Sequence, residues 1–278
     1  MTINEVLVVK SPKLGQIILA KTKQKSYFCF HIKHFKSVKL KMQPILALIE
    51  QKKQEYAQLP LFNFMQNKSI NPRQRLAWAP CAAHFIMNFG EVNKYFLRVE
   101  PTTDPIQALI NKHTYEDDHH WLWFLEDLKN LELDKSLKFS DALKFLWDEE
   151  TKNARWLNYH LYRYTSNATP IQKIIIIEVL EATGNIMFST AAEIGKEIKE
   201  ITQKPCRYFA DFHLNVETGH ITGTSGIEQF LQDIQLSEEA RQEACELVEN
   251  LFTVFTQFTN ELLVYAETHK IEQELKAA

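Results

Sequence analysis

The stretch HTYEDDHHWLWFLEDL, residues 113–128, places three histidines and three carboxylates in its first eight positions and mostly apolar residues after them. A run of acidic residues is most often the solvated face of a helix, and a lone histidine is more often structural than a ligand. Imidazole nitrogens and carboxylate oxygens at this density also form half of many metal sites. Which interpretation holds depends on whether the chain carries a matching second half.

A helix through this stretch brings several of the side chains that could bind a metal onto one face. Each residue of an α-helix advances by about 100°, so His113, Glu116 and His120 fall at about 0°, −60° and −20°. We therefore predict a helix over residues 105–131 in which these three side chains form one inward stripe. Residues 117–119 are expected to lie outside the stripe.

The stretch HLNVETGH, residues 213–220, shows the same pattern in mirror image. On a helix, His213, Glu217 and His220 fall at about 0°, 40° and −20°, again on one stripe. Two helices with stripes of histidine and glutamate are a stronger signal than either stripe alone. The sequence therefore predicts that both stripes contribute to one metal site.

The apolar segment IIIIEVLEATG, residues 174–184, supplies a further carboxylate. Burying a charge there is costly unless a cation or hydrogen bonds compensate it. Glu181 is the preferred ligand, and Glu178 stays open as the alternative. Helical bundles build dinuclear sites from inward-facing glutamate and histidine on different helices, and such ligands suit iron or manganese.

The composition favours a helical fold. The 278 residues include only seven glycines and nine prolines and are 45% hydrophobic, so a core can form while turn-rich β architectures are disfavoured. We predict one all-α bundle over residues 41–278, preceded by an N-terminal arm, residues 1–40, that is irregular or partly extended. Helical apolar spacing covers residues 42–58, 71–100 with a kink at Pro80, 105–131, 140–164, 171–188, a segment from about 207, and a long segment from about 236.

Charge and cysteine content narrow the classes of partner. The formal net charge of −3 gives no electrostatic reason to expect nucleic acid, and no apolar stretch predicts a membrane span. The four cysteines lie far apart, and the N-terminal stretch lacks the pattern of a signal peptide. We therefore expect a cytoplasmic protein with reduced thiols that acts on a small molecule, with a homodimer as the default oligomeric state.

These motifs resemble the haem-oxygenase-like diiron oxidase superfamily, a group of iron-containing redox enzymes related to TenA/PqqC-like proteins. Residues 113–128 are similar to the family's H-x-x-E-E-x-G-H-x-x-W…D-L helix, with Asp117 at the second glutamate and His119 at the glycine. Residues 213–220 resemble the later H-x-x-x-D-x-x-H helix, with glutamate in place of aspartate. The resemblance covers about residues 105–265, and many members have a glutamate where this chain has His113.

The resemblance implies a haem-oxygenase-like bundle of about seven core helices that binds two Fe(II) ions. It further implies that O2 is the co-substrate and that a small organic substrate is oxidised, often in a biosynthetic pathway. The metal ligands expected from the stripes and the resemblance together are His113, Glu116, His120, Glu181, His213, Glu217 and His220.

Three alternatives stay open. A haem- or tetrapyrrole-binding protein on the same fold would use one axial histidine and would not need the glutamates. A TenA-like hydrolase would need an activated thiol, for which Cys206 is the candidate. A non-catalytic helical interaction protein would have a stability that does not change with metal.

Overall fold

The computed structural model describes residues 5–11, 15–21, 27–31, 40–218 and 225–271, and the chain divides into two compact units, Met1–Leu40 and Lys41–Ala278. The first unit contains a three-stranded antiparallel sheet in which β2 is central. Its strands are β1 (Glu5–Ser11), β2 (Gly15–Lys21) and β3 (Tyr27–His31). The two-residue strands β4 (Leu40–Lys41) and β5 (Gln235–Leu236) form a second, short ladder.

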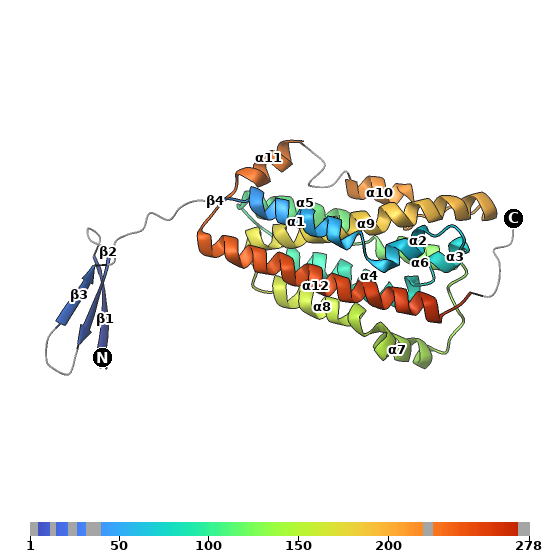
Figure 1. The fold of residues 1–278 in the computed structure, drawn as a ribbon, viewed down its shortest axis with the longest axis horizontal. Helices are drawn as coiled ribbons and strands as arrows, with labels where there is room; N and C mark the ends of the chain where they lie inside the picture. The colour runs from blue at the N-terminus through green and yellow to red at the C-terminus, as the bar shows by residue number, and fades with distance from the viewer. Residues whose placement is uncertain (1–4, 12–14, 22–26, 32–39, 219–224, 272–278) are drawn as a thin grey trace. The chain divides into compact units, whose positions relative to one another are not determined.

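The second unit is helical (Figure 1), as predicted from the scarcity of turn-forming residues. Its first half contains α1 (Gln43–Tyr56), α2 (Pro60–Gln66), α3 (Pro72–Arg75), α4 (Ala79–Val92), the π-helical turn η1 (Asn93–Leu97) and α5 (Pro105–Asp117). It continues with α6 (Trp121–Asn130), α7 (Phe139–Trp147), the 3-10 turn η2 (Glu149–Thr151), α8 (Lys152–Thr165), α9 (Pro170–Thr202), α10 (Asp211–Thr218), α11 (Ser225–Asp233) and α12 (Glu238–Thr268).

Local capping signals set the start of the two longest helices. At α9, Thr169 and Gln172 form a reciprocal capping box, and Pro170 occupies the first turn, where its missing N–H has no helical partner. At α12, the hydroxyl of Ser237 accepts the N–H of Ala240 at 3.1 Å. These caps explain why both helices begin sharply after a polar residue.

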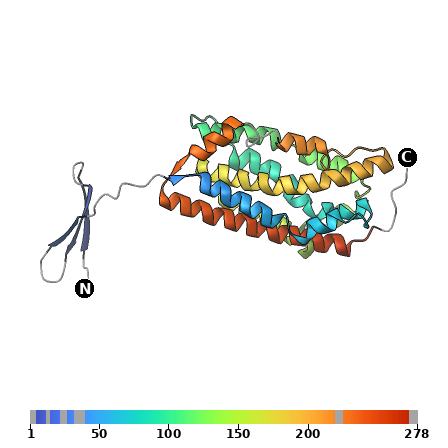
Figure 2. The ribbon, with the colours of Figure 1, turned by 45° about the horizontal axis from the view of Figure 1, so that its top comes forward.

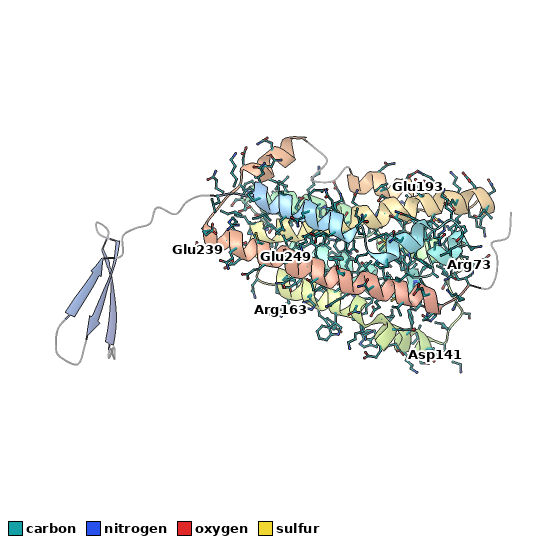
Figure 3. All side chains as sticks on the ribbon, viewed as in Figure 1. Arg73, Asp141, Arg163, Glu193, Glu239 and Glu249 are labelled. Atoms are coloured by element: carbon teal, nitrogen blue, oxygen red, sulfur yellow. The ribbon has the colours of Figure 1, made fainter. Side chains whose placement is uncertain are left out.

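The core of the helical unit forms where α1, α9 and α12 pack against one another (Figures 1 and 2). The four isoleucines at residues 174–177 of α9 are all fully buried. Among the described residues, α9 is also the one helix long and apolar enough to cross a membrane, but 61% of its most apolar window is buried within the bundle. Core packing accounts for its composition. Charged side chains such as Arg163, Glu193 and Glu249 are exposed on outer faces (Figure 3).

Three of the predicted helices are divided in the structure. The predicted helix 105–131 is interrupted by a turn at residues 118–120, and the predicted helix 71–100 is interrupted at residues 76–78. Pro80 therefore lies in the first turn of α4 and does not kink a longer helix. The third break follows α7, where Asp148 is extended. Each break redirects the chain while the apolar spacing continues, so periodicity alone could not show it.

Candidate metal centre

His113 and Asp117 lie one turn apart near the C-terminal end of α5. Their side chains are 0% and 1% exposed, and His113 Nε2 is 3.0 Å from Asp117 Oδ2. Residues four apart share a helix face, which accounts for the contact. α5 is fixed at its other end by Asp104, whose carboxylate accepts the N–H groups of Ile106 and Gln107.

Glu181 approaches this pair from α9. Its Oε1 lies 3.5 Å from His113 Nε2, and its side chain is 13% exposed. One ligand atom from each of His113, Asp117 and Glu181 lies within 4.8 Å of the other two. Glu178, one turn earlier on α9, is buried but does not belong to this group. Of the two carboxylates that the sequence left open, the fold brings Glu181 to His113.

Two further imidazoles, His120 and His213, meet beside this group. His213 Nε2 on α10 is 3.1 Å from His120 Nδ1, and His120 Nδ1 is 3.8 Å from Asp117 Oδ1. The other ring nitrogen of His213, Nδ1, is 2.9 Å from the backbone oxygen of Tyr208. A carbonyl oxygen only accepts hydrogen bonds, so Nδ1 donates one to Tyr208, and the neutral form of the ring then has its lone pair on Nε2, facing His120.

The prediction that Asp117 lies outside the inward stripe was wrong. Asp117 is 2% exposed and belongs to the group above, whereas Glu116 is half-buried and is not one of those three residues. α5 ends at Asp117, and His120 follows a turn, so the two histidines at 113 and 120 are not on one continuous helix. The advance of 100° per residue therefore does not hold across the break. The packing of α9 against α5 brings Glu181 to His113 and Asp117.

Two glycines allow the turns that precede α6 and α10 to approach neighbouring helices. A Cβ on Gly90 would lie 2.7 Å from the backbone oxygen of Asp118. A Cβ on Gly195 would lie 2.0 Å from the backbone oxygen of Phe209. Because real Cβ atoms do not approach backbone oxygens this closely, only glycine permits these contacts. Both turns lead directly into residues of the candidate centre.

Asp127 on α6 is a buried carboxylate that sequence reasoning did not identify. It is 0% exposed and accepts backbone N–H groups from Arg207, Tyr208 and Phe209 at 2.8–3.0 Å. Burial raises the pKa of its carboxyl, an effect that these three N–H donors oppose. The signal that could have found it is a carboxylate inside the apolar run that follows His120.

Two predicted ligands fall outside what the structure describes. Glu217 belongs to α10, but its side chain lies outside the described residues, and so does the whole of His220. Both stay predictions.

A cavity of about 90 Å³ lies against the candidate centre. Asp117, His120, Glu181 and His213 line one part of it, and no lysine or arginine lines it within the described part of the chain. Walls of low polarity strengthen electrostatic interactions inside such a space and favour an organic ligand of few atoms. The remaining lining is mostly apolar or aromatic and includes Tyr56, Trp78, Phe85, Phe89, Phe188 and Phe258.

The donor set fits a divalent ion such as iron(II). It comprises three imidazoles and two carboxylates, and combined nitrogen and oxygen donors of this kind suit iron or manganese. The facing atoms of His113 and Asp117 lie 3.0 Å apart and those of His120 and His213 lie 3.1 Å apart, so each pair would be near enough to share an ion.

The thiol of Cys206 is not poised for nucleophilic chemistry. Burial raises its pKa to about 12, and it does not line the cavity. At pH 7 fewer than about one molecule in 10⁴ would carry the thiolate. We expect iodoacetamide to leave Cys206 unmodified under conditions that label the half-buried Cys245, as measured by peptide mass spectrometry. Labelling of Cys206 at the same rate would bring back the thiol hydrolase alternative.

Comparison with known proteins identifies the fold. No family model and no curated protein matches the chain. A solved structure that does match is a domain of unknown function with a haem oxygenase-like fold from Shewanella denitrificans, at 11% sequence identity and a TM-score of 0.54. The match covers 81% of this chain and 91% of that one. Because this identity is low, the match shows the fold and not the activity. The chain therefore has a haem-oxygenase-like fold.

Proposed function

We propose that this protein is a cytoplasmic non-haem diiron oxidase that activates O2 to oxidise a small organic substrate in a biosynthetic pathway. The observation that supports the proposal most is the convergence of four buried residues, His113, Asp117, His120 and His213, with the partly buried Glu181; all of them except His113 line an aromatic cavity. Gathering two carboxylates and three imidazoles away from water is costly, and a bound cation would offset that cost.

The two oxygens of Asp117 face different histidines. Oδ2 lies 3.0 Å from His113 Nε2, and Oδ1 lies 3.8 Å from His120 Nδ1. In this proposal, His113, Asp117 and Glu181 would hold one ion, and His120 and His213 would contribute to holding a second. Glu217 and His220 are further expected ligands. Bound ferrous iron supplies the one-electron chemistry and the affinity for O2 that amino-acid side chains lack.

The protein's own residues orient the ligands and keep water out. The carbonyl of Tyr208 holds the proton on His213 Nδ1, so that Nε2 stays available as a ligand. The ring of Phe188 lies 4.0 Å from that of His213, and the ring of Trp123 stacks on His120 at 4.2 Å, which restricts both imidazoles. The aromatic walls of the cavity exclude bulk water from the reacting substrate.

The structure disfavours two of the alternatives. A cavity of about 90 Å³ favours a ligand of few atoms over a tetrapyrrole. The thiol of Cys206 is buried and protonated, which disfavours a thiol hydrolase. The remaining alternative, a non-catalytic interaction protein, differs from the proposal in its response to metal.

Anaerobic loading with Fe(II) tests the proposal directly. We expect about two irons per chain, because His113 lies on one side of Asp117 and His120 with His213 on the other. Exposure of the loaded protein to O2 should then change its optical and Mössbauer spectra. Trace iron only, or a loaded protein that does not respond to O2, would contradict the assignment.

Metal should also stabilise the fold. An ion that binds only the folded chain adds about 2.7 kcal/mol to the free energy of unfolding at a free concentration of 100 Kd. The measurement is urea unfolding under anaerobic conditions, with Fe(II) or with a chelator. Identical curves in the two conditions would favour the non-catalytic interaction protein.

A further inference from the structure

One buried carboxylate organises the turn at residues 207–209. Asp127 Oδ2 accepts the N–H groups of Arg207, Tyr208 and Phe209 at 3.0, 2.8 and 2.9 Å, and Oδ1 accepts that of Arg207 at 2.8 Å. Three consecutive N–H groups converge on the same carboxylate, and hydrogen bonds to a charged acceptor are stronger than neutral ones. The backbone of this turn therefore depends on Asp127.

The turn contacts one imidazole of the candidate centre through its backbone. The oxygen of Tyr208 lies 2.9 Å from His213 Nδ1, and the ring of Tyr208 lies 4.6 Å from the ring of His213. Tyr208 therefore connects the two groups. Asp127 holds its N–H, and its carbonyl sets the tautomer and the direction of His213.

The same turn contacts the other imidazole through a stack of side chains. The guanidinium of Arg207 lies 4.5 Å from the ring centre of Trp123, within the range of a cation–π interaction. Trp123 in turn stacks on His120, with ring centres 4.2 Å apart and planes 21° apart. Displacing Arg207 would therefore loosen the support of His120.

We infer that Asp127 is a positioning residue that orients both His120 and His213 through the turn at residues 207–209. It does not line the cavity, so its effect passes through other residues. The inference rests on the proposed function, since it takes these imidazoles as metal ligands. Partners that orient metal-binding histidines in this way change metal affinity by about 10–100-fold when they are removed.

The test compares Asp127→Asn with Glu261→Gln in the full chain, using Co(II) as the probe ion. Glu261 is a matched control because it accepts two backbone N–H groups at the start of α8, from Asn153 at 2.7 Å and Ala154 at 3.0 Å, and does not line the cavity. Burial raises the pKa of its carboxyl as it does for Asp127. Both variants therefore lose a carboxylate that holds backbone N–H groups, buried at Asp127 and half-buried at Glu261.

We expect Asp127→Asn to weaken Co(II) binding by about 10–100-fold and to alter the visible Co(II) spectrum. Glu261→Gln should stay within about threefold of the unsubstituted protein, because its site is separate from the imidazoles. Equal losses of affinity in both variants, or an unchanged spectrum in Asp127→Asn, would overturn the inference. If the unsubstituted protein binds neither Co(II) nor Fe(II), the proposed function fails with it.

Arg207→Ala keeps the test decisive if Asp127→Asn does not fold. This change retains the backbone N–H that Asp127 accepts and removes the side chain whose guanidinium lies over Trp123 and near Phe212. We expect a smaller loss of Co(II) affinity together with a spectral change. An unchanged affinity and spectrum would overturn the part of the inference that concerns His120.

Discussion

Asp117→Asn is expected to lower the affinity for Fe(II) or Co(II) by more than about 100-fold, since even partners outside the ligand set are worth 10–100-fold. One carboxylate oxygen of Asp117 faces His113 and the other faces His120, and an amide offers one acceptor in place of two. Its side chain is 1% exposed, so no water replaces the lost oxygen without rearrangement. The measurement is anaerobic titration followed by metal analysis of the desalted protein.

Glu116→Gln is the matched control, because it makes the same chemical change one residue away on α5. Glu116 is half-buried and is not part of the group formed by His113, Asp117 and Glu181, so we expect metal binding to stay near that of the unsubstituted protein. Periodicity predicts Glu116 as the ligand, whereas the structure places Asp117 beside His113. The two variants therefore distinguish these arrangements. Loss of metal in Glu116→Gln with retention in Asp117→Asn would restore the periodicity-based ligand.

Gly195→Ala is expected to lower the free energy of unfolding by about 2–4 kcal/mol. The added Cβ would lie 2.0 Å from the backbone oxygen of Phe209, so either α9 or the turn before α10 must move. That turn is held by Asp127 and leads into His213, and its movement should also weaken metal binding. Urea unfolding followed by circular dichroism measures the first effect, and Co(II) titration measures the second.

Gly184→Ala provides the comparison within the same helix. Within the described part of the chain, a Cβ there would meet the ring of Phe188 alone, at 3.5 and 3.7 Å, which is ordinary contact. Alanine is favoured over glycine inside a helix by about 0.5–1 kcal/mol, so the change should leave stability unchanged or raise it. If both variants were equally stable, the close approach of the Phe209 carbonyl would not be a constraint on α9.

Several features of the site could be predicted from the sequence because they depend on composition and local spacing. The isoleucine-rich segment makes Glu181 conspicuous, since a carboxylate in a buried helix calls for a partner. The density of histidines in residues 113–120 and 213–220 likewise marks His113, His120 and His213, and the structure brings all three together. The scarcity of glycine and proline indicated the all-α fold, which the structural comparison confirms.

Other features could not be predicted, because they depend on contacts between distant segments. The local sequence does not show that α5 ends at Asp117. The turn that follows lies against α4, where Gly90 leaves room for it. Asp127 stands out locally as a carboxylate in an apolar run, but its three backbone partners lie about 80 residues further along the chain and could not be predicted from that run.

By itself, the sequence determined that this protein is a helical bundle and that histidines and carboxylates from three segments belong to its interior. Helical periodicity and the cost of burying charge are properties of short segments, and both can be evaluated without knowing the fold. Only the tertiary structure decided that Asp117, which periodicity placed outside the stripe, is buried beside His113, and that Glu181 approaches the same histidine. The physical reason is that a ligand set is chosen by which side chains converge across helices. His120 and His213 meet at 3.1 Å although they lie 93 residues apart, and no local pattern encodes that approach.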